Sequence, residues 1–386
     1  MKVAIIFHDA NYYSGATRSM LDIIDNWKEN NKCEILAVFP QKAGTAIDYL
    51  KEKGIATYSC KYYDSFVLLN QPNIKKILKF PQYISKYIAT YITGTMILSK
   101  KLRKEKYDVI YTNVSGVLLG AWVKKKMDIV HVWHFREYGE EDHRLGIFGG
   151  RKNFYKIVNK YCNAVVCISN SLKNKYCKYI DNNLLYRVYD DVSKKYINFT
   201  EKNFQEKTFN ILIAGQISEG KKQHIAIEMQ EKLSSLGMNS ELWIAGTAAN
   251  ENYYNKIKQQ ISRSRERSKI HLLGHVNEMN TLRKKMHFGV VPSESEAFGR
   301  VTIEGMLSGM IMICSNSGAN KELITDGYNG FLFEINEIDK VCNQIIECEK
   351  KGKLSKISQN AFDYGQKFTK GRGAFKIMDI MERINK

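Results

Sequence analysis

Short apolar runs recur along the chain and alternate with longer stretches in which apolar residues return every three or four positions. The first half holds five such runs, at residues 3–7, 33–39, 107–113, 128–135 and 163–169. Strands that are apolar at nearly every position and alternate with helices are typical of a parallel sheet covered on both faces. The first half is therefore predicted to be a doubly wound α/β domain.

The same pattern starts again after a polar, aromatic stretch, with six further runs at 209–215, 240–246, 269–275, 288–293, 310–316 and 330–334. A chain of 386 residues exceeds the size at which one hydrophobic core usually stops growing. We therefore predict two Rossmann-like domains in tandem, at 1–190 and 209–369. Residues 191–208 would be a linker, and 370–386 a C-terminal helix that could cross back to the first domain.

The cysteines and the first apolar run indicate the cellular compartment of the protein. The eight cysteines are dispersed and form no C-x-x-C pair, which is typical of reduced thiols in a cytosolic protein. The apolar run at residues 3–7 is too short for a signal peptide or a membrane span. A cytoplasmic location is therefore expected.

The chain is strongly basic. Its 59 basic minus 40 acidic residues give a formal charge of +19, which attracts nucleic acid, anionic lipid or phosphorylated substrates. Residues 73–106 carry nine Lys or Arg against one Glu, with isoleucines and tyrosines near helical spacing. This segment is predicted to be a basic amphipathic helix. It fits either a peripheral contact with an anionic membrane or a core-facing helix with a solvated outer side.

Two glycine loops follow predicted strands. Gly15 lies just beyond the first strand, where a close backbone approach and the free N–H groups of a helix start favour an anion. Gly215 and Gly220 flank a similar loop, and Lys221 and Lys222 stand at the following helix start, where the helix dipole favours anions. The two lysines are cations and are therefore unfavourable at this end of the helix, unless a bound phosphate lies between them and the helix start. A tight turn and solvated surface lysines are the alternatives.

Two glutamates mark the stretch PSESEAFGRVTIEGMLSG. Glu296 lies in the predicted loop and Glu304 one turn inside the following helix, so both can face a ligand at the helix start. The N–H groups near Phe298, Gly299 and Arg300 suit phosphate oxygens, and carboxylates accept hydrogen bonds from hydroxyls. A sugar nucleotide has both groups. The alternative is a pair of acids that merely satisfy the helix dipole.

These residues together resemble a known family. Ser293–Glu304 and Gly318–Leu332, preceded by Gly215–Lys221, are similar to family 4 of the retaining glycosyltransferases, whose E-x7-E signature Glu296 and Glu304 match. Gly305 replaces the usual Ala, Met310 and Ile311 stand near the usual Gly-x-Pro, and Ala319 replaces a Gly. The resemblance implies the GT-B architecture, in which two Rossmann-like doubly wound domains face each other across a cleft.

The resemblance also implies roles for individual residues. The donor would be a nucleoside diphosphate sugar, held without a metal or other cofactor. Glu296 would hold sugar hydroxyls, Glu304 the ribose, and Lys221 the diphosphate, whose developing charge it would neutralise. The catalytic set would be His134, Glu296 and Lys221. The donor-binding set would be Gly15, Ala16, Gln216, Val276, Phe298, Gly299, Arg300, Val301 and Glu304.

Some positions leave questions open. Gln216 occupies a position where the family usually has an arginine, and we hypothesise that Arg300 supplies the missing charge. His134 follows a strand and is expected to contact the donor sugar, with His131 as its competitor. On the acceptor side, the resemblance implies Asn113, Arg136 and Glu137. Asp190 and Asp191 are interpreted as turn or hinge residues rather than ligands.

The function expected from the resemblance is transfer of a sugar, with retention, to a glycan or lipid-linked acceptor in cell-envelope polysaccharide biosynthesis. The enzyme would work in the cytoplasm, peripherally at the inner face of the cell membrane. A noncatalytic partner of another glycosyltransferase is the alternative, and Gln216 favours it. A nucleic-acid-binding protein is indicated by charge alone, because no recognition motif accompanies the charge.

Overall fold

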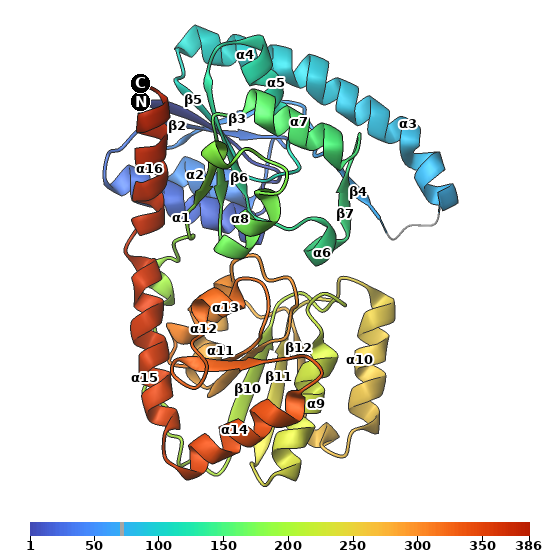
Figure 1. Cartoon of the computed structure of the whole chain (residues 1–386), viewed down its shortest axis with the longest axis vertical. Helices are drawn as coiled ribbons and strands as arrows, with labels where there is room; N and C mark the ends of the chain where they lie inside the picture. The colour runs from blue at the N-terminus through green and yellow to red at the C-terminus, as the bar shows by residue number, and fades with distance from the viewer. Residues whose placement is uncertain (70–72) are drawn as a thin grey trace. The chain divides into compact units, whose positions relative to one another are not determined.

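The chain folds into two compact units (Figure 1). The computed structural model describes residues 1–69 and 73–386, and the side chains of these except 73–77 and 143. The first unit consists of Met1–Asp191 and Gly371–Lys386, and the second of Val192–Lys370. Each unit has its own parallel sheet and its own core.

The sheet of the first unit has the strand order β3-β2-β1-β5-β6-β8-β9, with every neighbouring pair parallel. Its strands are β1 (Lys2–Ile6), β2 (Glu34–Phe39), β3 (Ala56–Ser59), β5 (Val109–Thr112), β6 (Val130–Phe135), β8 (Ala164–Cys167) and β9 (Leu185–Arg187). A separate antiparallel pair joins β4 (Phe66–Leu68) to β7 (Leu145–Ile147). The strand order reverses between β1 and β5, which is where doubly wound sheets bind ligands.

Helices cover both faces of this sheet. One face packs against α1 (Gly15–Glu29), α2 (Thr45–Glu52) and α16 (Arg372–Ile384). The other packs against α4 (Thr95–Glu105), α5 (Leu119–Lys126) and α7 (Arg151–Tyr161). The unit also contains α3 (Asn73–Ala89), a π-helical turn (Thr90–Gly94), α6 (Glu140–His143), α8 (Asn170–Tyr176) and a 3₁₀ turn (Asn182–Leu184).

The sheet of the second unit has the order β12-β11-β10-β13-β14-β15 and is also parallel. Its strands are β10 (Phe209–Ala214), β11 (Ser240–Ala245), β12 (Ile270–Gly274), β13 (Phe288–Val291), β14 (Ile311–Ser315) and β15 (Gly330–Phe333). The order reverses between β10 and β13. The loops after these two strands therefore lie at the switch point of this unit.

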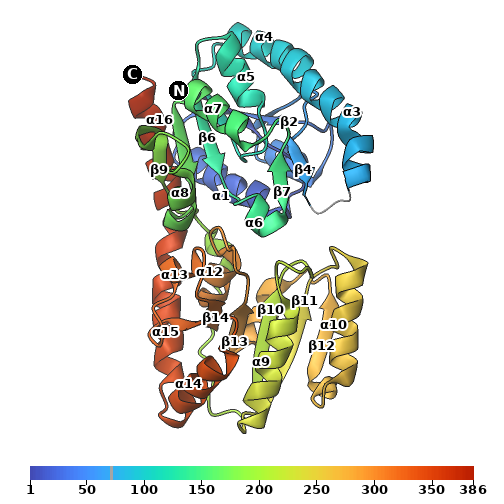
Figure 2. The ribbon, with the colours of Figure 1, turned by 45° about the vertical axis from the view of Figure 1, so that its right-hand side comes forward.

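Helices cover this second sheet as well. Figure 2 shows α9 (Gln223–Ser235) and α10 (Glu251–Arg263) beside β10, β11 and β12. The core on this side also takes in α14 (Ile338–Lys350), whereas α12 (Arg300–Met306) packs with α15 (Leu354–Gly365) and β14. Two short helices, α11 (Met279–Lys284) and α13 (Asn320–Leu323), and 3₁₀ turns at Lys194–Tyr196, Arg267–Lys269 and Gln366–Thr369 complete the unit.

The predicted fold class is confirmed, because all eleven apolar runs are strands of two parallel sheets. Four short strands were not predicted: β3, β4, β7 and β9. Residues 192–208, predicted as a linker, lie in the second unit. There Lys202 Nζ donates hydrogen bonds to the carbonyls of Arg283 and Lys284, at 3.2 and 2.6 Å. Within the two described segments, no helix is both long and apolar enough to cross a membrane.

The N-terminus of the C-terminal helix α16 is anchored to the rest of the first unit. The carboxylate of Asp191 accepts hydrogen bonds from the backbone N–H groups of Gly373 and Ala374, at 3.2 and 2.7 Å. The indole of Trp27 donates to the Ala374 carbonyl at 2.8 Å. A Cβ at Gly373 would lie 2.3 Å from the Tyr189 carbonyl oxygen, so this close approach requires glycine.

We expect Asp191→Ala to lower the free energy of unfolding of the first unit by about 1–2 kcal/mol, because two N–H groups at a helix start lose their acceptor. Asp191→Asn keeps one acceptor oxygen and should cost less. Urea unfolding followed by the indole N–H NMR resonance of Trp27 measures both effects. Equal stability of Asp191→Ala and the unchanged protein would show that the cap contributes nothing.

The same carboxyl group has a pH signature. Burial raises the pKa of Asp191 from 3.8 to about 6, although the two N–H donors act in the opposite direction. The folded state therefore holds this proton more tightly than the unfolded state. The contribution of Asp191 to stability falls as pH rises from about 4 to about 6 and is constant above that. Asp191→Asn should lack this slope.

Candidate functional site

Except for Val276, which follows β12, the predicted donor-side residues of the second unit follow β10 and β13, at its switch point. Lys221 follows β10 and Glu296 follows β13, and the Lys221 Nζ donates a hydrogen bond to Glu296 Oε2 at 2.9 Å. The neighbouring Lys222 pairs with Glu294 Oε1 at 2.7 Å. Because β10 and β13 are adjacent strands, two loops far apart in sequence are brought together here.

The backbone of Glu296 is held by the loop after β14. Gly318 has a φ of +55°, and a Cβ there would lie 2.6 Å from the Glu296 carbonyl oxygen. The N–H of Ala319 donates to that oxygen at 2.8 Å. Gly318 is thus required by both its φ and its contact, whereas the next position accepts the alanine that replaces the usual glycine.

The helix after Glu296 begins in a constrained turn. Gly299 has a φ of +89°, and a Cβ there would lie 2.8 Å from Leu323 Cδ1. Phe298 is buried, with its ring 5.9 Å from the ring of Phe368, and Val301 is half-buried. The N–H groups at the start of α12 have no acceptor within the helix itself, as at any helix N-terminus.

Glu304 is buried inside α12 between two arginines. Arg283 Nη2 donates to Glu304 Oε2, and Arg300 Nε donates to Glu304 Oε1 at 2.9 Å. Both guanidinium groups lie over the ring of Tyr196, at 5.8 and 5.5 Å from its centre. Two positive charges face one carboxylate, so this cluster carries a formal charge of +1.

Arg283 was not predicted from the sequence. It lies in the basic run LRKK at 282–285, which reads as solvated surface, and no sequence signal distinguishes it. Its burial follows only from the position of α11 beside α12. Arg300 contacts Glu304, and its proposed compensation for Gln216 stays a hypothesis. Gln216 itself is exposed, with its carbonyl bonded to Gln223 Nε2 at 3.1 Å. Val276 is half-buried in the turn after β12.

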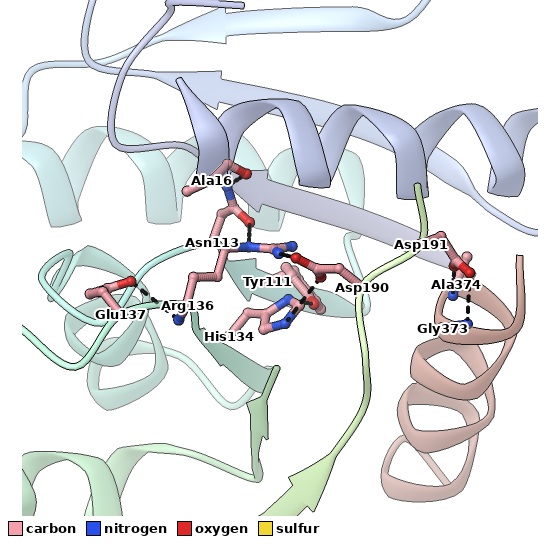
Figure 3. A network of polar contacts seen from close by, with 10 residues as sticks. All are labelled: Ala16, Tyr111, Asn113, His134, Arg136, Glu137, Asp190, Asp191, Gly373 and Ala374. Atoms are coloured by element: carbon pink, nitrogen blue, oxygen red, sulfur yellow. Dashed lines mark hydrogen bonds and ion pairs between the residues drawn. The ribbon is translucent and has the colours of Figure 1, made fainter. Parts of the chain in front are cut away.

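A chain of hydrogen bonds crosses the switch point of the first unit (Figure 3). Asn113, after β5, donates through Nδ2 to the carbonyl of Ala16 at the start of α1, at 3.0 Å. Its Oδ1 accepts from Arg136 Nε at 2.8 Å, and Arg136 Nη1 continues to Asp190. Gly15 is exposed and has open space where a Cβ would lie.

His134 is fully buried beside this chain. Its Nδ1 bonds to the Tyr111 hydroxyl, and its Nε2 lies 3.9 Å from Asp190 Oδ1. Burial, aided by the charge of Arg136, lowers the pKa of His134 well below its usual value, so the ring is neutral. The competitor His131 is also buried. It bonds to Thr112 Oγ1 at 2.9 Å and the Tyr161 carbonyl at 2.7 Å, which marks a satisfied structural histidine.

Three buried polar atoms of this network have no hydrogen-bond partner within the described residues: His134 Nε2, Arg136 Nη2 and Asp190 Oδ1. The interpretation of Asp190 as a turn residue missed its buried ion pair with Arg136. The reason is that the two residues lie 54 positions apart, and only the sheet brings them together. Tyr111, on the neighbouring strand, was missed for the same reason.

Glu137 lies beside this network, where its Oε2 accepts a hydrogen bond from the backbone N–H of Arg136 at 3.2 Å (Figure 3). It accepts hydrogen bonds from the backbone N–H of Ser115, at 2.7 Å, and from the Ser115 hydroxyl. Burial raises the pKa of Glu137, although the bonds from Ser115 act against this shift. The three predicted acceptor-side residues, Asn113, Arg136 and Glu137, are therefore buried, and each bonds to other residues of this unit.

The structure thus forms three clusters from the predicted residues. Lys221 and Glu296 form the first, Glu304 and Arg300 with Arg283 the second, and Ala16, Asn113 and Arg136 the third. Among the described side chains, which leave out that of His143, no three His, Cys, Asp or Glu group so that they could hold a metal ion.

Comparison with known proteins gives the following similarities. The family described as "Glycosyl transferases group 1" matches residues 195–364. The uncharacterized glycosyltransferase MJ1178 of Methanocaldococcus jannaschii is 26% identical over 338 residues, which cover 85% of this chain and 88% of that protein. The UDP-Gal:alpha-D-GlcNAc-diphosphoundecaprenol alpha-1,3-galactosyltransferase of Escherichia coli is 24% identical over 282 residues, covering 68% and 72%.

A solved structure shares the fold along the chain. The crystal structure of Anabaena HepE in complex with UDP is similar with a TM-score of 0.78 and 19% identity, covering 99% of this chain and 100% of that one. At this identity the similarity establishes the fold.

Proposed function

Because residues 195–364 match the glycosyl transferases group 1 family, we propose that the chain transfers a sugar from a nucleoside diphosphate sugar to an acceptor, with retention at the anomeric carbon. The single observation that carries this proposal is the Lys221–Glu296 bond at the switch point of the second unit. The Lys221 ammonium, which can bind a phosphate, lies 2.9 Å from the Glu296 carboxylate, which can bind sugar hydroxyls. Both lie in the loops where such folds bind ligands.

Lys221 is proposed to stabilise the charge that develops on the leaving diphosphate. In the structure its ammonium pairs with Glu296, and a bound diphosphate would be a further anionic partner. The cluster of Arg283, Arg300 and Glu304 adds its formal charge of +1 in the same unit. We therefore propose that the neutral Gln216 does not leave the donor diphosphate without protein cations, and that no metal is needed.

Glu304 is proposed to hold the ribose of the donor. Each of its oxygens already accepts one hydrogen bond from an arginine. A carboxylate oxygen can accept more than one hydrogen bond, so the arginine bonds are compatible with ribose hydroxyls as further donors. The two arginines then fix the direction of the carboxylate. Val276 for the base and the N–H groups of Phe298, Gly299, Arg300 and Val301 for the sugar and diphosphate complete the proposed donor set.

Residues of the first unit have proposed roles as well. The exposed Gly15 and the adjacent Ala16 fit the close backbone approach expected of a donor-binding loop. The buried, neutral His134 fits a positioning residue that acts through Asp190 and Arg136 better than one that touches a sugar. Its direct contact with the donor stays a prediction, as do the acceptor contacts of Asn113, Arg136 and Glu137.

The relatives indicate which substrates to test first. One is named for a UDP-galactose donor and a diphosphoundecaprenol-linked acceptor, and HepE was crystallised with UDP. We propose a uridine nucleotide donor and a glycan or lipid-linked acceptor in cell-envelope polysaccharide biosynthesis, with the enzyme in the cytoplasm at the inner face of the membrane. The alternative is a noncatalytic partner of another glycosyltransferase, which the exposed Gln216 favours.

The test is release of nucleoside diphosphate by the purified chain from a panel of donors, with acceptor lipids extracted from membranes. We expect one donor to be consumed, and product NMR to show the donor's anomeric configuration. Glu296→Gln should lower turnover by about 10–100-fold, because it replaces a charged acceptor of sugar hydroxyls. Glu294→Gln, at an exposed neighbouring acid, is the control. Nucleotide binding without turnover on any pair would favour the noncatalytic alternative.

A further inference from the structure

The helical segment from α3 to α4 exposes a line of apolar side chains, the apolar stripe: Ile84, Ile88, Ile92 and Met96. Their exposed fractions are 37%, 48%, 51% and 55%. The opposite side of the segment packs against the rest of the first unit, and there Thr90, Gly94 and Leu98 are buried. The described chain therefore covers one side of the segment and leaves the stripe to solvent.

A π-helical turn keeps the stripe straight. Residues four apart advance by about 40° around an α-helix, so Met96 would lie about 120° from Ile84 in an unbroken helix. The turn Thr90–Gly94 is π-helical, and the N–H of Thr95 bonds back to the carbonyl of Thr90. This extra residue turns the following helix back by about 100°, which returns Met96 to the side of Ile84.

The π turn is held in place by the body of the first unit. Thr90 Oγ1 accepts a hydrogen bond from the N–H of Tyr63 at 2.9 Å. A Cβ at Gly94 would lie 2.8 Å from the carbonyl oxygen of Lys61, so only glycine allows this approach. The alignment of the apolar stripe is thus built into the tertiary structure.

One end of the stripe borders a basic hollow of about 400 Å³, lined by Met96, Ser99, Lys100, Arg103, Lys104 and Lys126. The lining holds four cations and no acid. None of these cations pairs with a carboxylate within the part of the chain that the structure describes. The nearby Glu105 pairs with Lys101 instead. Four unpaired positive charges around one hollow favour an anion.

Ser99 marks the hollow as a built site. It is 1% exposed and lines the hollow, and its Oγ has no hydrogen-bond partner among the described residues. A buried hydroxyl without a partner costs free energy unless a ligand or water satisfies it. Phosphate oxygens accept hydrogen bonds from hydroxyls and ion pairs from lysine and arginine, so they satisfy both needs at once.

We propose that the hollow binds the phosphate headgroup of an anionic membrane lipid while the apolar stripe enters the headgroup region beside it. Met96 belongs to both surfaces, so one lipid can contact the cations with its phosphate and the stripe with its acyl chains. Free phosphate would use the same cations but leaves the stripe without a partner, and the stripe therefore favours the lipid. This inference deepens the membrane contact proposed above and is independent of the transfer reaction.

The test is flotation of the full chain with phosphatidylcholine vesicles that contain or lack phosphatidylglycerol. Binding is expected only with phosphatidylglycerol. Arg103→Ala with Lys104→Ala should weaken it by about 30-fold, because each cation near an anionic surface contributes about a fivefold factor. Ile88→Glu with Ile92→Glu should abolish it without lowering thermal stability, since both side chains are half exposed.

The matched control is Lys340→Ala with Lys350→Ala, which removes two positive charges from exposed positions of α14 in the second unit. It should bind as the unchanged protein does. Absence of flotation, or equal weakening in this control, would overturn the proposal. Calorimetric binding of inorganic phosphate without flotation would assign the hollow to free phosphate instead. Donor turnover without vesicles should be unchanged in all variants, so a failed flotation leaves the transferase proposal intact.

Discussion

Lys221→Ala is expected to lower kcat/KM for the nucleotide sugar by about 10²–10³-fold, the cost of removing one preorganised group that stabilises charge in a transition state. The structure gives the reason. Lys221 Nζ lies 2.9 Å from Glu296, which is proposed to hold the donor sugar. Without the lysine, the negative charge that develops on the leaving diphosphate is repelled by the Glu296 carboxylate, and no Lys221 ammonium offsets this repulsion. Steady-state assays of nucleoside diphosphate release measure the effect.

Lys222→Ala is the matched control for this variant. Lys222 is adjacent in sequence and pairs with Glu294, whose side chain is 60% exposed. We expect turnover close to that of the unchanged protein. Lys221→Arg keeps the charge and should retain part of the activity. Equal losses in Lys221→Ala and Lys222→Ala would mean that general surface charge, and not the switch-point lysine, assists departure of the diphosphate.

Glu304→Ala is expected to lower the free energy of unfolding of the second unit by about 3–5 kcal/mol. The substitution leaves Arg283, which is 4% exposed, as a buried charge without its carboxylate. Trp243 is the only tryptophan of the second unit, so its indole N–H NMR resonance, separate from those of the three tryptophans of the first unit, reports urea unfolding of that unit.

Two further variants separate the ion pair from simple packing. Glu304→Leu combined with Arg283→Met and Arg300→Met removes all three charges of the cluster and should restore most of the lost stability, because apolar replacement of a buried ion pair or triad is often neutral. Glu294→Ala, which breaks an exposed pair, should have a much smaller effect. If Glu304→Ala is as stable as the unchanged protein, the pair with Arg283 does not exist in solution.

The strands could be predicted because burial on both faces of a parallel sheet requires nearly continuous apolar runs, as in β1 and β10. The four strands that were missed carry less of this signal. β3 reads ATYS, with no buried residue in the structure, and β9 has three residues of which one is buried. An edge or short strand is defined by its neighbours' hydrogen bonds, which a sequence pattern does not contain.

The candidate site was predictable where one loop carries the signal. Glu296, Gly299 and Glu304 lie within nine residues of one another, and their spacing was visible. Arg283 and Asp190 were not, because their chemistry depends on partners 21 and 54 positions away. For His134 the sequence predicted a position after a strand, whereas the structure places it inside β6 (Val130–Phe135), and its burial beside Tyr111 and Asp190 needed the sheet.

The sequence by itself determined two parallel sheets, the loops that follow their strands, the basic helical segment and the acids of the E-x7-E stretch. These follow from local patterns of burial and turn chemistry. Only the tertiary structure decided which charges meet. Lys221 reaches Glu296 because β10 and β13 are neighbours, and Arg136 reaches Asp190 because strands distant along the chain share one sheet. Ion pairs depend on distances of a few ångströms, and strand order, which no local pattern encodes, sets those distances.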